Sequence, residues 1–258
     1  MTRDLVGQVA LVTGAASGIG RALVDELGAR GAHVIALDVQ HSADGHDSYV
    51  CDVRDEVAVD RVATEVEREH GAVDLLFVNA GVATAGAVDA VPVSDARWVL
   101  EVNVLGALIV ARRFSTAMVQ RGRGRIVFTA SIAGLVGVPE MSAYSASKHA
   151  VVGLAESLRG ELSGSGVGIT TICPGYVRTG LHRATRYHDS PIERLLDAPM
   201  HAGLDAAEVA RRSVDAALRG RGVVPMGVER WGVWLSRLSP TLYARAGGVT
   251  RRWLKARA

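Results

Sequence analysis

Short apolar runs alternate along the chain with longer stretches of helical period. The runs of strand length are 8–12, 33–38, 48–51, 74–78, 125–130 and 167–173. Between the first two, Ile19, Ala22, Leu23 and Leu27 recur at helical spacing, and Gly28 and Gly31 then supply a helix stop. Further helices are expected near 55–70, 95–121 and 143–163. This strand–helix–strand order predicts a parallel sheet.

The central runs indicate that helices cover both faces of this sheet. Residues 74–78 and 125–130 are almost continuously apolar, as in strands buried on two sides. The expected fold is therefore a single-domain, Rossmann-like, doubly wound α/β sheet, which binds ligands beyond the carboxyl ends of its strands. A chain of 258 residues suits one such domain. We predict a dinucleotide-binding catalytic domain over residues 1–225, with 226–258 as a basic amphipathic extension of it.

Composition excludes several classes of protein. Hydrophobic residues make up 48% and the net charge is only +2, so neither disorder nor nucleic-acid binding is expected. Cys51 and Cys173 lie in apolar stretches, which predicts buried free thiols rather than a disulfide. The apolar run 9–12 is too short for a signal peptide, and no run reaches the roughly 18 apolar residues of a membrane span. A cytoplasmic location is expected.

A glycine-rich turn lies where the first strand meets the first helix. Thr13 is followed by Gly14, Ser17, Gly18, Ile19 and Gly20. Glycine lets the backbone approach a pyrophosphate, and the helix N-terminus offers free N–H groups and a positive dipole end. Asp38 ends the second strand and can accept hydrogen bonds from ribose hydroxyls while repelling a 2′-phosphate, which favours NAD over NADP. The alternative is an ordinary turn capped by a strand-end aspartate.

Together with later motifs, this turn resembles the short-chain dehydrogenase/reductase family over about residues 5–225. The motifs, in chain order, are Gly14-x-x-x-Gly18-x-Gly20, Asn79-Ala80-Gly81, Asn103, Ser131, Tyr144-x-x-x-Lys148 and Pro174-Gly175-x-Val177-x-Thr179. The chain has Val78 where the family usually has another asparagine. The resemblance implies an oxidoreductase that forms a homotetramer or homodimer.

Tyr144 and Lys148 are the expected acid–base pair. They lie four residues apart in a predicted helix, so their side chains share one face. A tyrosine of pKa near 10 is a poor base at pH 7, and a neighbouring ammonium is expected to lower its pKa. Lys148 is one of only two lysines among 29 basic side chains, which suggests a role that arginine cannot fill. The alternative is an exposed surface pair.

Ser131 and Asn103 complete the expected catalytic group. Ser131 follows an apolar strand and could hydrogen-bond a substrate carbonyl oxygen, or it could simply cap a turn. The resemblance implies that Asn103 distorts its helix and orders a water leading to the lysine; otherwise it is an exposed polar position.

The remaining cofactor contacts rest on the resemblance alone. It implies that Asp52 and Val53 contact the adenine and that Asn79, Ala80 and Gly81 pass close to the adenosine half. It also implies that the segment Pro174, Gly175, Val177 and Thr179 holds the nicotinamide ring. Tyr144 and Lys148 are expected to touch the cofactor as well.

Residues 180–203 are expected to form a lid with the 82–92 loop. The lid offers the apolar side chains Leu181, Tyr187, Leu195, Leu196 and Met200, which suggest a hydrophobic secondary alcohol or ketone as substrate. Such side chains can also serve only to dock the lid. His182, His188 and His201 match no familiar metal spacing, so no metal site is expected.

The C-terminal segment is basic and amphipathic. Residues 221–258 hold eight Arg or Lys against Glu229, a local charge of +7. Trp231, Trp234, Leu235 and Leu238 share one helical face, which is expected to pack on the body, the lid or another subunit. Peripheral contact with an anionic membrane is the alternative.

Two functions follow from these patterns. The first is an NAD-dependent dehydrogenase or reductase in which Tyr144 exchanges the proton. The second is a catalytically silent dinucleotide-binding sensor or scaffold, which would need the glycines and Asp38 but not Ser131, Tyr144 and Lys148. The presence of all three favours the enzyme.

Overall fold

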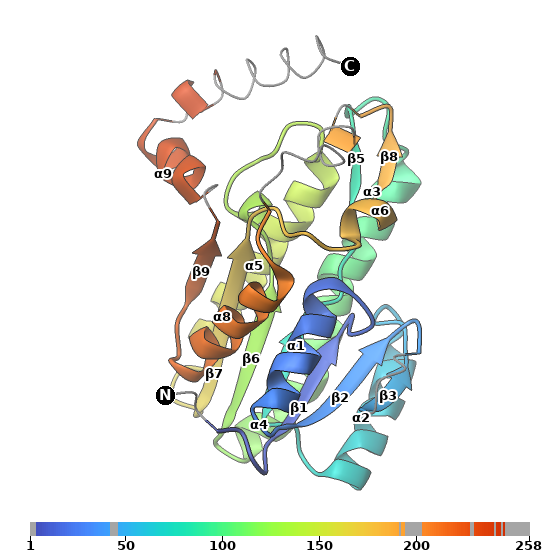
Figure 1. Cartoon of the computed structure of the whole chain (residues 1–258), viewed down its shortest axis with the longest axis vertical. Coiled ribbons are helices and arrows are strands. Elements are labelled where there is room, and N and C mark those ends of the chain that lie inside the picture. Colours follow the sequence, from blue (N-terminus) through green and yellow to red (C-terminus); the bar gives the residue numbers. More distant parts are fainter. Residues whose placement is uncertain are drawn as a thin grey trace.

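A seven-stranded parallel sheet forms the centre of the molecule in the computed structural model, which describes residues 4–41, 46–190, 192–193, 203–227, 230–239, 241–243 and 245. The order across the sheet is β3 (Asp47–Val50), β2 (His33–Asp38), β1 (Val9–Thr13), β4 (Leu75–Val78), β6 (Gly124–Thr129), β7 (Val167–Pro174) and β9 (Val223–Met226) (Figure 1). The chain runs outward from β1 to β3 and then from β4 to β9. The order therefore reverses between β1 and β4, where a crevice opens in such sheets.

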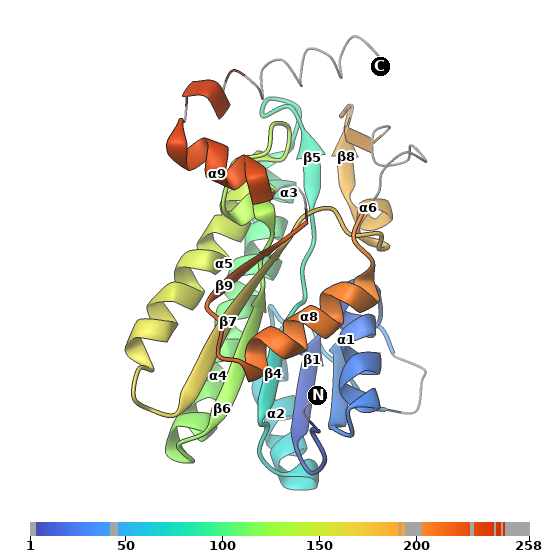
Figure 2. The same ribbon diagram turned by 60° about the vertical axis from the view of Figure 1, so that its left-hand side comes forward.

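Helices cover both faces, as the apolar strands predict. The helices α2 (Glu56–His70), α4 (Ala107–Gln120) and α5 (Ser142–Glu161) pack on one face, and α1 (Gly18–Ala29) and α8 (Ala206–Leu218) pack on the other (Figure 2). Side chains alternate between these cores along each strand, so Leu11 of β1 packs with α2 and α4 while Val12 packs with α1. The predicted doubly wound single domain is confirmed. Cys51 and Cys173 are buried and free, also as expected.

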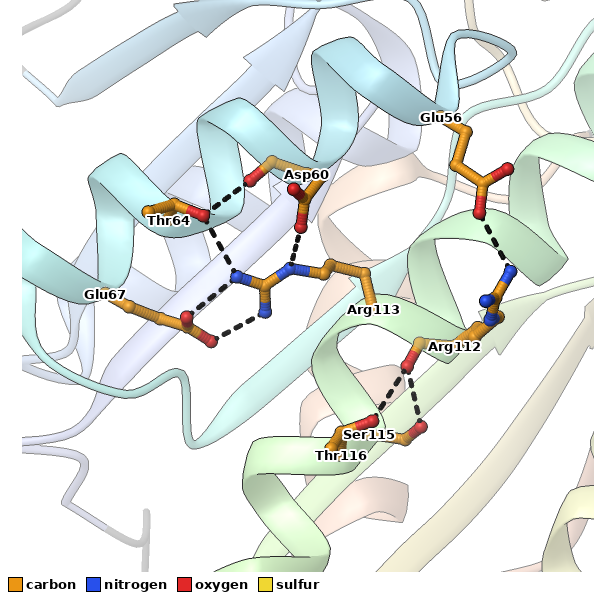
Figure 3. A network of polar contacts seen from close by, with 8 residues as sticks. All are labelled: Glu56, Asp60, Thr64, Glu67, Arg112, Arg113, Ser115 and Thr116. Carbon is orange, nitrogen blue, oxygen red and sulfur yellow. Dashed lines mark hydrogen bonds and ion pairs between the residues drawn. The ribbon is translucent and has the colours of Figure 1, made fainter.

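An ion-pair network joins α2 to α4 along the outside of the first core (Figure 3). The Arg113 guanidinium donates to Asp60 at 2.7 Å and to both carboxylate oxygens of Glu67 at 2.9 and 3.0 Å. A second pair joins Arg112 to Glu56 at 2.8 Å. These contacts fix how α4 lies beside α2, and α4 continues the helix that contains Asn103.

The helix expected over 95–121 is interrupted by a π-helical segment. It consists of α3 (Val93–Leu100), the π segment η1 (Glu101–Gly106) and α4. By length and composition the continuous span 93–121 could cross a membrane, but Val110, Phe114 and Met118 are buried against the sheet. The interruption contains Asn103, so the predicted local distortion is present.

Smaller elements lie above the carboxyl ends of the strands (Figure 1). A two-stranded parallel ladder pairs β5 (Thr84–Gly86) with β8 (Arg186–His188), next to the short helix α6 (Leu181–Ala184). The 82–92 loop and the predicted lid thus meet through backbone hydrogen bonds. Leu195, Leu196, Met200 and His201 fall outside the described residues.

The C-terminal helix α9 (Arg230–Leu238) contacts the body through a face other than the expected one. Val233 is buried against Ile132 and Val136, whereas the side chains of Trp234 and Leu238 are 61% and 80% exposed. The expected packing on the body is therefore wrong for Trp234 and Leu238, and packing of this face on another subunit stays a prediction. The side chain of Trp231 falls outside the described residues, and the membrane alternative stays a prediction.

Candidate active site

The glycines after β1 let the turn lie against neighbouring backbone atoms at distances that any side chain would prevent. Gly14 has a φ of +66°, and a Cβ there would lie 2.8 Å from the Cα of Ala80. A Cβ on Gly20 would collide with the carbonyl oxygen of Gly14. The backbone of β1 therefore turns directly into α1, and Gly18 and Ile19 at the start of α1 line a cavity beyond the strand ends. This cradle fits a pyrophosphate.

Thr13 and Asn79 hold this turn in place. The hydroxyl of Thr13 accepts hydrogen bonds from the backbone N–H groups of Asn79 and Ala80 at 2.9 and 3.0 Å. The Asn79 amide donates to the carbonyl oxygens of Thr13 and Gly14 at 3.0 and 3.3 Å. These bonds tie the end of β4 to the turn after β1. From the sequence, Thr13 was placed only at the start of the glycine-rich turn, and its buried hydroxyl was not predicted to make these contacts.

Acidic side chains lie at the far end of the crevice. The carboxylate of Asp38 accepts from the N–H groups of Ala16 and Gln40 at 2.9 and 3.1 Å. Asp52 makes a bidentate ion pair with Arg54, whose shortest contact is 2.6 Å, and this guanidinium lowers the pKa of Asp52. Arg54, which sequence reasoning also missed, lines the cavity with its charge already paired to Asp52.

Ser131, Tyr144 and Lys148 meet at the opposite end. Ser131 follows β6, and its hydroxyl accepts from the N–H of Ala133 at 3.1 Å. Tyr144 and Lys148 lie one turn apart on α5, with the ammonium 5.7 Å from the centre of the phenol ring. The Lys148 ammonium donates to the carbonyl oxygen of Thr129 at 2.9 Å. Both α5 side chains are buried, so the surface-pair alternative for them is wrong.

The pKa values of this pair differ from the sequence-based expectation. Burial raises the pKa of Tyr144, and a hydrogen bond with Ser131 acts in the opposite direction. The Lys148 ammonium donates to the carbonyl oxygen of Thr129 rather than to the phenol. Burial in turn lowers the pKa of Lys148 to about 8. The phenol is therefore the stable form of Tyr144 at neutral pH.

Asn103 is buried within the π segment and is fully hydrogen-bonded. Its amide oxygen accepts from the N–H of Val82 at 2.8 Å, and its amide nitrogen donates to the carbonyl oxygen of Val82 and to Ser147 at 2.9 Å each. The Ser147 hydroxyl donates to the carbonyl oxygen of Tyr144 at 2.7 Å. The exposed alternative for Asn103 is wrong: it links the loop after β4 to the first turn of α5.

One cavity of about 980 Å³ joins the two ends. Of the predicted site residues it is lined by Gly14, Ser17, Gly18, Ile19, Asp38, Asp52, Val53, Asn79, Ala80, Gly81, Ser131, Tyr144, Lys148, Pro174, Gly175, Val177 and Thr179. Gly20 and Asn103 do not line the cavity. Gly20 lets α1 begin close to the carbonyl oxygen of Gly14, and Asn103 holds the backbone of Val82, which lines the cavity. Residues from the ends of six strands (β1, β2, β3, β4, β6 and β7) thus line a single cavity.

The cavity continues past Tyr144 under the β5–β8 ladder. Its wall there includes the apolar side chains Ala83, Val138, Met141, Leu181 and Ile192. His182 of the predicted lid also lines this end, as do Trp98 and Glu140, which were not predicted to do so. A small molecule entering here would lie between an apolar wall and the Ser131–Tyr144 hydroxyls.

Comparison with known proteins agrees with this geometry. The profile of the short chain dehydrogenases matches residues 8–190. The dehydrogenase/reductase SDR family member 7B of Rattus norvegicus is 32% identical over 257 residues, covering 92% of this chain and 79% of its own. This span is longer than the residues 5–225 over which the motifs indicate a resemblance.

Two further matches come from bacteria. The 3-oxoacyl-acyl-carrier-protein reductase MabA of Mycobacterium avium is 36% identical over 181 residues, covering 69% of this chain and 71% of its own. A short chain dehydrogenase/reductase from Burkholderia phymatum, solved in complex with NAD, is 31% identical with a TM-score of 0.85, covering 93% of this chain and 96% of its own. The chain therefore belongs to the short-chain dehydrogenase/reductase family and is a nicotinamide-dependent oxidoreductase that acts on CH–OH groups.

Proposed function

We propose that this enzyme interconverts a hydrophobic secondary alcohol and its ketone with NAD(H), and that Tyr144 exchanges the proton. The observation behind the proposal is the continuous cavity that joins the glycine turn and Asp38 to Ser131, Tyr144 and Lys148. Its apolar wall around Met141 supports a hydrophobic substrate.

The chain's own residues divide the work between binding and proton transfer. When bound, the nicotinamide accepts or delivers the hydride. Ser131 would donate a hydrogen bond to the substrate oxygen and stabilise the charge that develops on it. Tyr144 would give its phenolic proton to that oxygen in reduction and remove it in oxidation. Lys148 would hold the nicotinamide ribose, and Asn103 would keep α5 in register with the loop after β4.

Asp38 supports NAD rather than NADP. A carboxylate at the end of β2 accepts hydrogen bonds from ribose hydroxyls and repels a phosphate in the same place. Among the described lining residues, Arg54 is the cation at this end of the cavity, and its positive charge is already paired with the carboxylate of Asp52 rather than available to a 2′-phosphate.

Replacement of Tyr144 by phenylalanine tests the proposal. Turnover of secondary alcohols and ketones should fall by about 100-fold or more, because the donated proton is lost, while NADH binding measured by fluorescence should stay close to wild type. The assay is an absorbance screen over a panel of alcohols and ketones, with NADP(H) as the cofactor control. Turnover in the variant close to that of wild type would refute the role of Tyr144. A chain that binds NADH but turns over none of the panel would favour the silent sensor.

We also propose that the enzyme is a cytoplasmic homo-oligomer, either a dimer or a tetramer. Leu105 and Leu108 are 52% and 41% exposed on the helix that contains Asn103. An apolar pair on the outer face of a long helix is typical of a contact between subunits.

A further inference from the structure

Two histidines and an aspartate converge far from the cavity. His33 is the first residue of β2, Asp47 is the first residue of β3, and His70 is the last residue of α2. One ligand atom from each lies within 4.8 Å of the other two. These element ends lie beside one another at the lower end of the molecule, opposite β5 and β8 (Figure 1). Because Asp38 ends the strand that His33 begins, the cluster is roughly 16 Å from the adenosine end of the cavity.

The spacing of the three atoms is close to that of a tetrahedral metal site. The Nε2 atom of His33 lies 2.9 Å from the Asp47 carboxylate and 2.9 Å from Nδ1 of His70. The third edge, from Nδ1 of His70 to Asp47, is 3.8 Å. Ligands at about 2.0–2.1 Å from zinc are about 3.3 Å apart in a tetrahedron. Each edge therefore differs from that spacing by about 0.5 Å or less, and the two rings, stacked at an interplanar angle of 29°, would have to rotate to direct both lone pairs at one ion.

Hydrogen bonding on the far side of His70 directs a lone pair into the cluster. The Tyr49 hydroxyl donates its one proton to Glu69 at 3.0 Å and lies 3.3 Å from Nε2 of His70. Tyr49 can then only accept from His70, which places the His70 proton on Nε2 and leaves Nδ1 unprotonated. Histidine ligands of metals commonly have such a partner on the other ring nitrogen.

The surroundings suit a cation with space for water. Asp47 and Glu69 place negative charge around the two rings, and the side chains of His33 and Asp47 are each 47% exposed. Without a metal, Nε2 of His33 has at most one proton to share between two acceptors at equal distance. Two imidazoles and one carboxylate favour zinc over magnesium or calcium.

We propose that His33, Asp47 and His70 form a binding site for Zn²⁺, with water as the fourth ligand. The ion would fasten the starts of β2 and β3 to the end of α2. Its role would be structural, because none of the three residues is among the described residues that line the cavity. The zinc site does not depend on the proposed redox activity, so an experiment that refutes one of these two proposals leaves the other unaffected.

Titration of the metal-free full chain, with any purification tag removed, tests the site. Calorimetry with ZnCl₂ should give one equivalent bound, and Co²⁺ should develop the visible absorption of a tetrahedral complex. His33→Gln, Asp47→Asn and His70→Gln should each weaken binding by at least about 10-fold, and Tyr49→Phe by a smaller factor. His149→Gln, which removes an exposed imidazole from α5, is the matched control and should bind as wild type.

Thermal unfolding gives a second readout. Zinc at about 100 times its Kd should raise the Tm of wild type by about 5–10 °C, and a chelator should reverse the shift. The same zinc should not shift the Tm of His70→Gln, while retained NADH binding shows that this variant is folded. Equal zinc affinity in wild type and the three ligand variants would overturn the proposal, as would the absence of a bound equivalent.

Discussion

Burial and Ser131 act on Tyr144 in opposite directions. Burial raises the pKa of the phenol, and the hydrogen bond with Ser131 lowers it. Oxidation needs the phenolate, so its rate should rise as pH approaches this pKa from below; reduction needs the phenol and should decline above it. Ser131→Ala removes the bond that lowers the pKa. We expect the inflection of the oxidation profile to move to higher pH, with kcat reduced about 100- to 1,000-fold by loss of the donor to the substrate oxygen.

Profiles of kcat/KM against pH in both directions measure this effect. Ser163→Ala is the control, since this serine is exposed beyond the end of α5 and should leave both profiles unchanged. An inflection at the wild-type position in Ser131→Ala would show that the hydroxyl does not act on Tyr144.

Site residues that follow a characteristic spacing could be predicted from the sequence, whereas residues whose role depends on a contact with a distant part of the chain could not. Tyr144 and Lys148 are four apart on one helix, so their convergence follows from helix geometry alone. Thr13 holds the turn after β1 to the end of β4, a contact between residues 66 positions apart. Gly134 is similar, because a Cβ there would lie 2.5 Å from the carbonyl oxygen of Lys148. Neither residue has a local pattern that indicates its partner.

At the level of elements, one carboxylate holds the lid strand to the body. Asp95 of α3 accepts from Arg186 at 2.7 Å and from His188 at 2.8 Å, both on β8. Arg186 also lies 3.8 Å from the ring centre of Trp98, which lines the cavity. The Arg186 guanidinium keeps the pKa of Asp95 below its usual range, so the pair persists at neutral pH.

Asp95→Asn should loosen β8 over the substrate end of the cavity. We expect KM for the substrate to rise about 5- to 10-fold, equivalent to the loss of about 1 kcal/mol, with little change in the affinity for NADH. Steady-state kinetics and NADH titration separate the two quantities. Asp25→Asn removes an exposed ion pair with Arg21 on α1 and serves as the control. A similar rise in KM in both variants would argue against a specific role of the lid contact.

Helices and strands with long, regular patterns were predicted from the sequence, whereas short strands that depend on pairing with each other were not. The strands from β1 to β4 and the β6 and β7 strands follow from their apolar runs. The three-residue strands β5 and β8 exist only because residues 84–86 and 186–188 pair with each other. The Val223–Met226 strand contains Pro225, a residue that usually breaks strands. β9 tolerates it because, among the described strands, β9 lies at the edge of the sheet and pairs with β7 alone.

For the whole molecule, we propose that the outer side of α4 and α5 contacts a second subunit. Leu105 and Leu108 project from η1 and α4, and the exposed face of α5 presents the small residues Ala146, Ala150 and Gly153. Small residues at this spacing allow another helix to approach closely, and apolar neighbours supply the area to bury. In a twofold-symmetric contact through this surface, each of these residues would lie in the interface once on each subunit.

Leu105→Glu tests this surface because it places a carboxylate in the contact on both subunits. Burial of two unpaired charges should weaken association by at least about 100-fold, so light scattering after size exclusion should show a shift toward monomer. Since Leu105 is 52% exposed in the single chain, the variant should keep its Tm close to that of an isolated subunit and should still bind NADH. Val88→Glu places the same charge on an exposed loop and should leave the assembly intact. An unchanged oligomer in Leu105→Glu would move the contact to another face, of which the exposed Trp234 side of α9 would be the next to examine.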